Sequence, residues 1–173
     1  MTDLRDLAVE IVERIREHFP DTDLTQQQVL CLAEEAGEFV GAYRRWAGMA
    51  RRTGPWEDVK AELADVTITA YTIAELLGFA DVLESIRDSL GEPRTHAAVR
   101  QVRTVFRAVG DFVDSFDRGV QSRSLVATRI AMVINVAYAV AQVLGIDLDA
   151  AVEEKTRVLF SRGWRDKPAE VAQ

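Results

Sequence analysis

Cysteine is nearly absent from this chain of 173 residues, and proline is scarce. The one cysteine, Cys31, excludes a disulfide within the chain and is typical of a reducing compartment, so we expect a cytoplasmic protein. The four prolines, Pro20, Pro55, Pro93 and Pro168, lie where the apolar pattern is interrupted. Because proline disrupts helix interiors, this distribution favours long helices between them.

Long hydrophobic runs and an excess of positive charge are also missing. No run approaches the ~20 apolar residues that span a bilayer, and the acid-rich amphipathic start does not resemble a signal or transit peptide. The 21 basic and 28 acidic residues give a net charge of -7, whereas proteins that bind duplex nucleic acids usually have a basic face. There is no P-loop and no dinucleotide fingerprint. We therefore expect no nucleic-acid or membrane partner, although a small phosphorylated ligand is compatible with this charge.

The apolar residues, 48% of the chain, recur with the 3.6-residue period of amphipathic helices. No strand-like alternation persists, so the pattern predicts an all-α bundle of seven helices. Asp23 and Thr25 are both candidates for the N-cap of the second helix. The expected ranges are about 3–19, 24–50, 57–78, 80–90, 95–119, 123–145 and 148–162.

Two parts of the chain resemble each other. "GEFVGAYRRW" (37–46) aligns with "GDFVDSFDRG" (110–119), and "ADVTITAYTIAELLG" (64–78) aligns with "AMVINVAYAVAQVLG" (131–145). Chance similarity between amphipathic helices would explain scattered apolar matches, but it explains less easily why glycine and tyrosine stay in step. We interpret the chain as one domain, 1–173, built from a duplicated helical hairpin with halves at about 1–90 and 95–165.

Acidic residues distinguish the two copies. The acids of the first copy, Glu34, Glu35, Glu38, Glu62 and Asp65, align with Arg107, Ala108, Asp111, Arg129 and Met132 of the second. The framework is thus repeated without most of its acids. Building the hairpin therefore does not require them.

The spacing of the acids predicts that they converge. Glu34 and Glu38 lie one turn apart, about 40° around the helix, while Glu62 and Asp65 are spaced i, i+3 on the next helix. If these helices pack antiparallel, four or five carboxylates meet at their interface. Like charges at this spacing are unfavourable, and partial burial raises the cost. A hard cation such as magnesium, which prefers oxygen ligands, would offset the repulsion.

The alternative is a solvated acidic face balanced by Arg44, Arg45 and Lys60, which is the usual role of charge runs. Taken alone, "EEAGE" (34–38) favours that alternative. The presence of "ELAD" (62–65) at the corresponding place on the following helix favours the metal site instead.

These motifs resemble a known signature. E-E-x-x-E at 34–38 followed by E-x-x-D at 62–65 is similar to the signature of the MazG-like all-α nucleoside triphosphate pyrophosphohydrolases. The apolar frames of "CLAEEAGEFVGAYR" and "KAELADVTITAYTIAELLG" resemble the two metal-binding helices of that family. "LGIDLDAAVEEKTRVLFSRGW" resembles the helix that follows them. The resemblance covers about half of the chain.

The resemblance implies an all-α enzyme of nucleotide-pool house-cleaning. Such an enzyme cleaves a (d)NTP between its α and β phosphates to give (d)NMP and pyrophosphate. It implies that Mg²⁺, or Mn²⁺ in its place, binds Glu34 or Glu35 together with Glu38, Glu62 and Asp65. It also implies that Glu38 or a neighbour such as Glu35 orients the attacking water.

Lys155 and Arg162 match basic positions of the family's late helix and would meet phosphate oxygens. One departure is Leu159, because family members often have an asparagine there. Family members usually work as dimers or tetramers of a single hairpin. The resemblance therefore implies a fused pair with one complete site and a degenerate second repeat, and such chains can pair further as a homodimer.

A second hypothesis is a catalytically inactive helical module that binds a nucleotide or a protein. The intact acids argue against it, and Leu159 argues mildly for it. Asn135, within an apolar helix, is a candidate nucleobase contact, but we expect a core amide bonded to the backbone.

Overall fold

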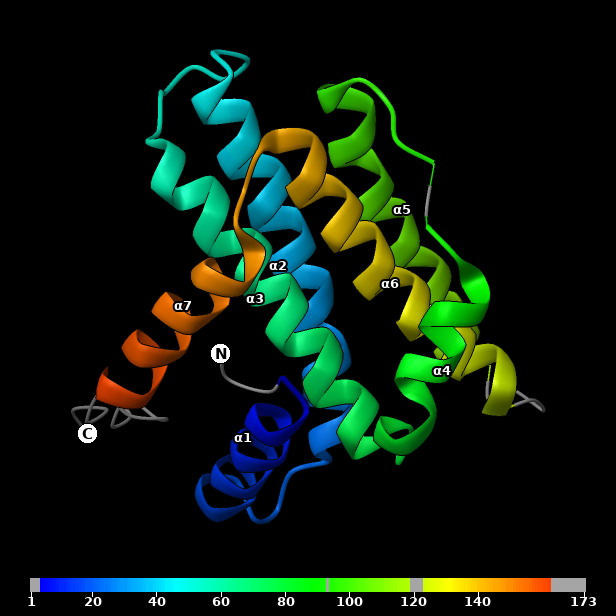
Figure 1. Ribbon diagram of the computed structural model, residues 1–173. Coiled ribbons are helices and arrows are strands. Elements are labelled where there is room, and N and C mark those ends of the chain that lie inside the picture. The colour runs from blue at the N-terminus through cyan, green and yellow to red at the C-terminus, as the bar shows by residue number, and fades with distance from the viewer. Residues whose placement is uncertain (1–3, 93, 119–122, 163–173) are drawn as a thin grey trace.

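The computed structural model describes residues 4–92, 94–118 and 123–162, and for Arg162 the backbone alone. This part of the chain is helical without strands, which confirms the predicted all-α class. The seven helices are α1 (Leu4–His18), α2 (Leu24–Trp46), α3 (Trp56–Leu76), α4 (Ala80–Leu90), α5 (Ala98–Asp117), α6 (Arg123–Leu144) and α7 (Leu148–Arg162) (Figure 1).

Most predicted helix ends agree with the structure to within three residues, but α2 ends at Trp46 rather than near residue 50. The reason is Gly48, whose φ of 70° is left-handed and cannot continue a helix. At the other end of α2 the carboxylate of Asp23 accepts hydrogen bonds from the backbone N–H groups of Thr25 and Gln26. Asp23 is therefore the N-cap, and the alternative, Thr25, lies inside the helix.

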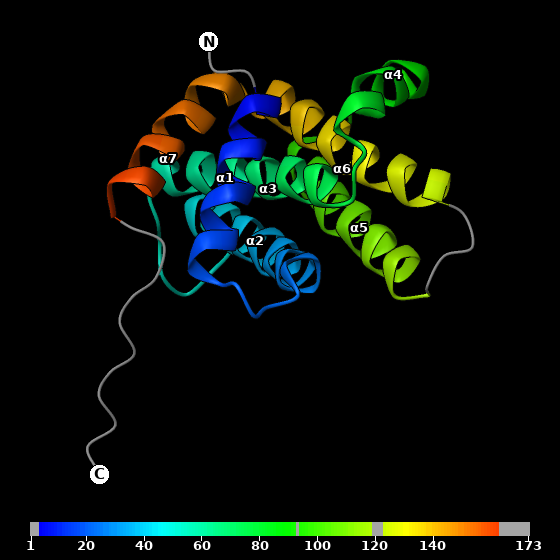
Figure 2. The ribbon, with the colours of Figure 1, turned by 90° about the horizontal axis from the view of Figure 1, so that it is seen from below.

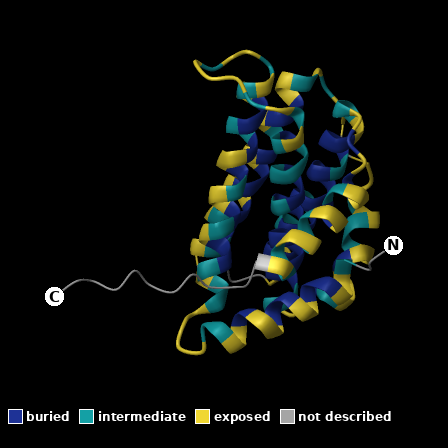
Figure 3. Ribbon diagram, turned by 90° about the vertical axis from the view of Figure 1, so that its left-hand side faces the viewer, coloured by how far each residue is buried: buried dark blue, intermediate teal, exposed yellow. Residues whose placement is uncertain are grey.

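The helix α3 is the centre of the bundle. It packs against α2 along its length and also contacts α1, α4, α6 and α7. The helices α5 and α6 form a second closely packed pair, and α5 also packs on α2. Side chains at helical spacing along α3, among them Val59, Leu63 and Val66, are fully buried. Figure 3 shows the buried residues where the helices face one another and the exposed residues on their outer sides.

By length and composition alone, the helix α6 is long and apolar enough to cross a membrane. Of its most apolar 18-residue stretch, 67% is buried inside the bundle. Such burial is typical of the inner helix of a helical bundle, which is often equally long and apolar.

The packing of the helices α4 and α7 decides where the site lies. The helix α4, which follows α3, packs on α6, and the helix α7, which follows α6, packs on α3 (Figures 1 and 2). Similar turns precede both helices: Gly78 and Gly145 have φ of 68° and 69°, and the residue after each donates back to a carbonyl of the preceding helix. Asp147 then caps α7 by accepting from the N–H of Ala150.

Candidate metal centre

Three of the predicted acids meet between α2 and α3. Ligand oxygens of Glu35, Glu62 and Asp65 all lie within 4.8 Å of one another. Each of the three residues is half-buried. The adjoining sides of both helices, with Leu32, Ala36 and Leu63 fully buried, face the core and so hold the carboxylates at this place.

The remaining two acids of α2 lie differently. Glu34 is exposed and is not part of the triad. Glu38 is also exposed and outside the triad, but its charge helps to raise the pKa of both Glu35 and Glu62. Glu38 therefore lies at the rim of the site, near Glu35 and Glu62.

The triad is electrostatically strained without a cation. Burial, and then the charge of Asp65, raises the pKa of Glu35 to about 7, with smaller contributions from Glu38 and Glu62. Burial and the charge of Asp65 likewise raise the pKa of Glu62, while the ammonium of Lys155 opposes this shift. Carboxylates that resist ionisation in a protein interior regain their charge when a cation joins them.

A basic side chain from the last described helix, α7, also lies at the site. Lys155 of α7 forms an ion pair with Asp65 through Nζ and Oδ2, and the two side chains are only 21% and 17% exposed. The ammonium of Lys155 thus pairs with one carboxylate of the triad and acts on a second, Glu62. The side chain of Arg162, the other predicted phosphate-binding residue, lies outside the described residues.

The dimensions of the triad suit magnesium. Magnesium binds oxygens at about 2.1 Å, so two ligands on opposite sides of one ion are about 4.2 Å apart. Three ligands cannot all lie opposite one another, and neighbouring ligands of one ion are about 3 Å apart, so the oxygens, now within 4.8 Å of one another, need to approach one another by at most about 2 Å. Carboxylate oxygen is also the donor that magnesium and manganese prefer. The residues present therefore fit the predicted ion.

Cys31 is a neighbour of the triad that sequence reasoning did not connect with it. Its thiol donates to Oε1 of Glu35 over 3.6 Å, and burial raises its own pKa to about 12. The i, i+4 spacing on α2 contained the signal for this contact. Because the thiol stays protonated, Cys31 acts as a weak donor that helps to orient Glu35.

A cavity of about 690 Å³ adjoins the site between α3 and α7. Its lining includes Lys155, Lys60, Trp56 and the small side chains of Ala61 and Ala151. This volume lies within the usual range of small-molecule sites, about 300–1,000 Å³. Lys155 thus borders both the carboxylates and a space large enough for an organic ligand.

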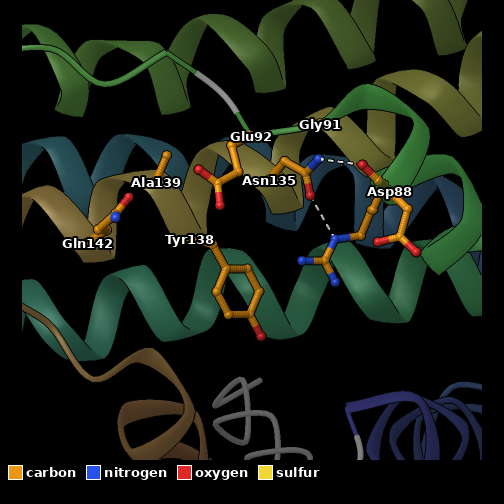
Figure 4. A pocket seen from close by; sticks show the side chains of 8 residues that line it. Asp88, Gly91, Glu92, Asn135, Tyr138, Ala139 and Gln142 are labelled. Carbon is orange, nitrogen blue, oxygen red and sulfur yellow. Dashed lines mark hydrogen bonds between the residues drawn. The ribbon is translucent and has the colours of Figure 1, made fainter.

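A second cavity, of about 550 Å³, lies between α4 and α6 (Figure 4). The guanidinium of Arg87 donates to Asn135 Oδ1 at 2.8 Å and to the hydroxyl of Tyr71 at 2.7 Å, and it lies 5.0 Å from the ring centre of Tyr138. The amide of Asn135 in turn donates to the backbone carbonyl of Arg87. Asn135 is therefore bonded to backbone, as expected, and also to a side chain that sequence reasoning missed. These contacts tie α3, α4 and α6 together.

Comparison of the chain with protein-family models, with curated proteins and with solved structures finds no match. The functional assignment of the acidic triad therefore depends on the residues and their geometry.

The raised pKa of Glu35 predicts how metal-free protein responds to pH. Below about pH 4.5 the Glu35 side chain is protonated in both the folded and the unfolded state. Between about pH 4.5 and about pH 7 the folded state binds the proton more tightly, so the free energy of unfolding falls as the pH rises. The full shift corresponds to about 3 kcal/mol, which partial exposure reduces to about 1–2 kcal/mol. In EDTA, the free energy of unfolding of Glu35→Gln should therefore rise by about 1–2 kcal/mol relative to that of the wild type between pH 5 and pH 8. Urea unfolding measures this difference. A difference that is constant with pH would contradict the assignment.

Proposed function

We propose that this protein is a magnesium-dependent nucleoside triphosphate pyrophosphohydrolase. The observation that carries the proposal is the triad of Glu35, Glu62 and Asp65, joined across α2 and α3 with oxygens within 4.8 Å. The signature spacing of the acids, which resembles that of MazG-like enzymes, supports the same function. Magnesium would be held by the triad, with Glu38 at its rim.

The reaction adds water across one phosphoric anhydride bond. The oxygen of water bonds to the α-phosphorus, the bond from that phosphorus to the α–β bridging oxygen breaks, and NMP and pyrophosphate leave. A bound magnesium ion supplies charge stabilisation for the phosphates and acidifies water. Among the protein's own groups, Glu38 or Glu35 accepts a hydrogen bond from the attacking water.

Lys155 has a second role in this proposal. Its ammonium balances Asp65 in the metal-free protein, and its position on the wall of the cavity lets it turn to a phosphate oxygen when the substrate binds. The cavity between α3 and α7 then receives the nucleoside, and Trp56, whose ring packs on Trp46 with the ring centres 4.5 Å apart, forms part of its wall.

We further infer that the chain is a duplicated MazG-like hairpin with one site. The reciprocal packing of α4 on α6 and of α7 on α3 supports this inference, because a fused pair related by a twofold axis would pack in this way. At the aligned positions of the second half, Arg129 lies 3.7 Å from Asp111. At the position aligned with Glu62 the second half thus has a guanidinium instead of a carboxylate.

A binding module without catalysis is the second candidate. The ion pair between Lys155 and Asp65 favours it, because that pair already offsets part of the negative charge without a metal. A module of this kind would bind a nucleotide and leave it intact.

A panel of nucleoside triphosphates, with magnesium and with EDTA, tests the two candidates. We expect magnesium-dependent formation of monophosphate and pyrophosphate in equal amounts, resolved by ³¹P NMR. Diphosphate with orthophosphate would indicate a different reaction. Binding of a nucleotide without any product would favour the inactive module.

A further inference from the structure

The charges of α5 are arranged against the helix dipole. Arginine occupies its N-terminal half at Arg100 and Arg103, while Asp114 and Asp117 lie in its last turn. Helices usually carry acids near the N-terminus and bases near the C-terminus, since the dipole stabilises them there. The observed order therefore gains nothing from the helix itself. It calls for an explanation outside the helix.

The outer face of the same helix is apolar and hollowed. Phe106 is 58% exposed and Val99 is 41% exposed. Phe106 borders a groove of about 380 Å³ that is also lined by Ala33 of α2, by Val109, Gly110 and Val113 of α5, and at one end by Asp114 and Asp117. In Figure 2, α5 forms an edge of the bundle, and none of the other described helices lies outside it.

The charged residues flank this face symmetrically. In the sequence, Arg103 and Asp114 lie equally far on either side of the point between Ala108 and Val109. Arg100 and Asp117 are also equally far from that point. Arg103 and Asp114 lie about three helical turns apart, on the same side as Phe106. A twofold axis through the centre would therefore place Arg103 opposite Asp114 of an identical helix, whereas Arg100 and Asp117 lie about 100° apart around the helix and do not share this side.

We propose that this face binds a second copy of the chain, with α5 antiparallel to α5 of the partner. Phe106 of one protomer enters the groove of the other, and Arg103 pairs with Asp114 in both directions. A twofold contact uses the same patch on both protomers and so requires self-complementarity of this kind. Gly110, whose missing side chain leaves open space near the centre, allows the two helices to approach closely.

The charge order favours a second copy over an unrelated protein. Within the described residues Arg103 makes no ion pair, and Asp114 pairs only with Arg118, at the exposed surface over 2.8 Å. An exposed pair of this kind is weak and exchanges readily for a partner. The proposal is independent of the proposed function, because Ala33, which lines the groove, and Glu35 of the triad lie on opposite sides of α2.

Sedimentation velocity on the full chain, at about 1 to 300 µM, tests the contact. We expect a reversible dimer for the wild type. Phe106→Ser should raise the dissociation constant at least tenfold, and so should Arg103→Asp or Asp114→Arg alone, since each places like charges together. The double variant R103D/D114R restores opposite charges and should dimerise nearly as well as the wild type. Val82→Ser, at a comparably exposed apolar residue of α4, serves as the control.

Circular dichroism checks that every variant keeps the wild-type fold. A monomeric wild type throughout this range overturns the proposal. A dimer that survives both Phe106→Ser and Arg103→Asp overturns it as well, because the contact must then use another face. Failure of the double variant to recover the dimer would overturn the antiparallel pairing.

Discussion

Replacing Asp65 by asparagine is expected to lower the rate of pyrophosphate release by about 100-fold or more, with the fold retained. Asp65 is the centre of the site: it belongs to the triad, pairs with Lys155, and is the acid whose charge most raises the pKa of Glu35 and Glu62. Asparagine keeps the shape but removes the negative charge with which Asp65 would hold the magnesium ion of the proposed function. The loss should appear in kcat rather than in KM alone.

The matched control is Glu75→Gln on the same helix. Glu75 is half-buried like Asp65 but lies almost three turns further along α3, outside the triad. It should retain activity within a factor of about two, since surface charges this far from a site act weakly. Equal loss in both variants would point to a general effect on α3. Full activity of Asp65→Asn would exclude the triad as the metal centre.

Replacing Lys155 by methionine is expected to change two affinities in opposite directions. The ammonium competes with a cation for Asp65, so its removal should tighten the binding of magnesium alone. It also removes a charged donor to phosphate, which contributes roughly 1.5 to 3 kcal/mol, so KM for the triphosphate should rise about 10- to 100-fold. Calorimetric magnesium titration and steady-state kinetics measure the two quantities.

Arg157→Met on the same helix is the control for Lys155. Arg157 is exposed and pairs with Glu154 on α7, so neither affinity should change. If Lys155→Met weakened both magnesium and triphosphate binding, Lys155 would have a structural role in docking α7. If it changed neither, the assignment of α7 to the site would be wrong.

The helices could be predicted from local features of the sequence. Apolar periodicity marks their faces, and proline and glycine mark their ends, because these residues restrict or release the backbone at their own position. The one clear error, the end of α2, also has a local cause in Gly48, whose left-handed conformation was not anticipated. The pairs Glu35–Glu38 and Glu62–Asp65 follow from helical spacing in the same way.

The sequence by itself thus determined the all-α class, the helix order and the presence of acids on two successive helices. Only the tertiary structure decided that Glu35, rather than Glu34, joins Glu62 and Asp65, because that choice depends on how α2 is rotated against α3. It also decided that Lys155 reaches Asp65, since nothing local in α7 specifies that it packs on α3. Side-chain periodicity is a property of one helix, whereas a site between helices depends on their mutual rotation and register, which the packing of the whole core fixes.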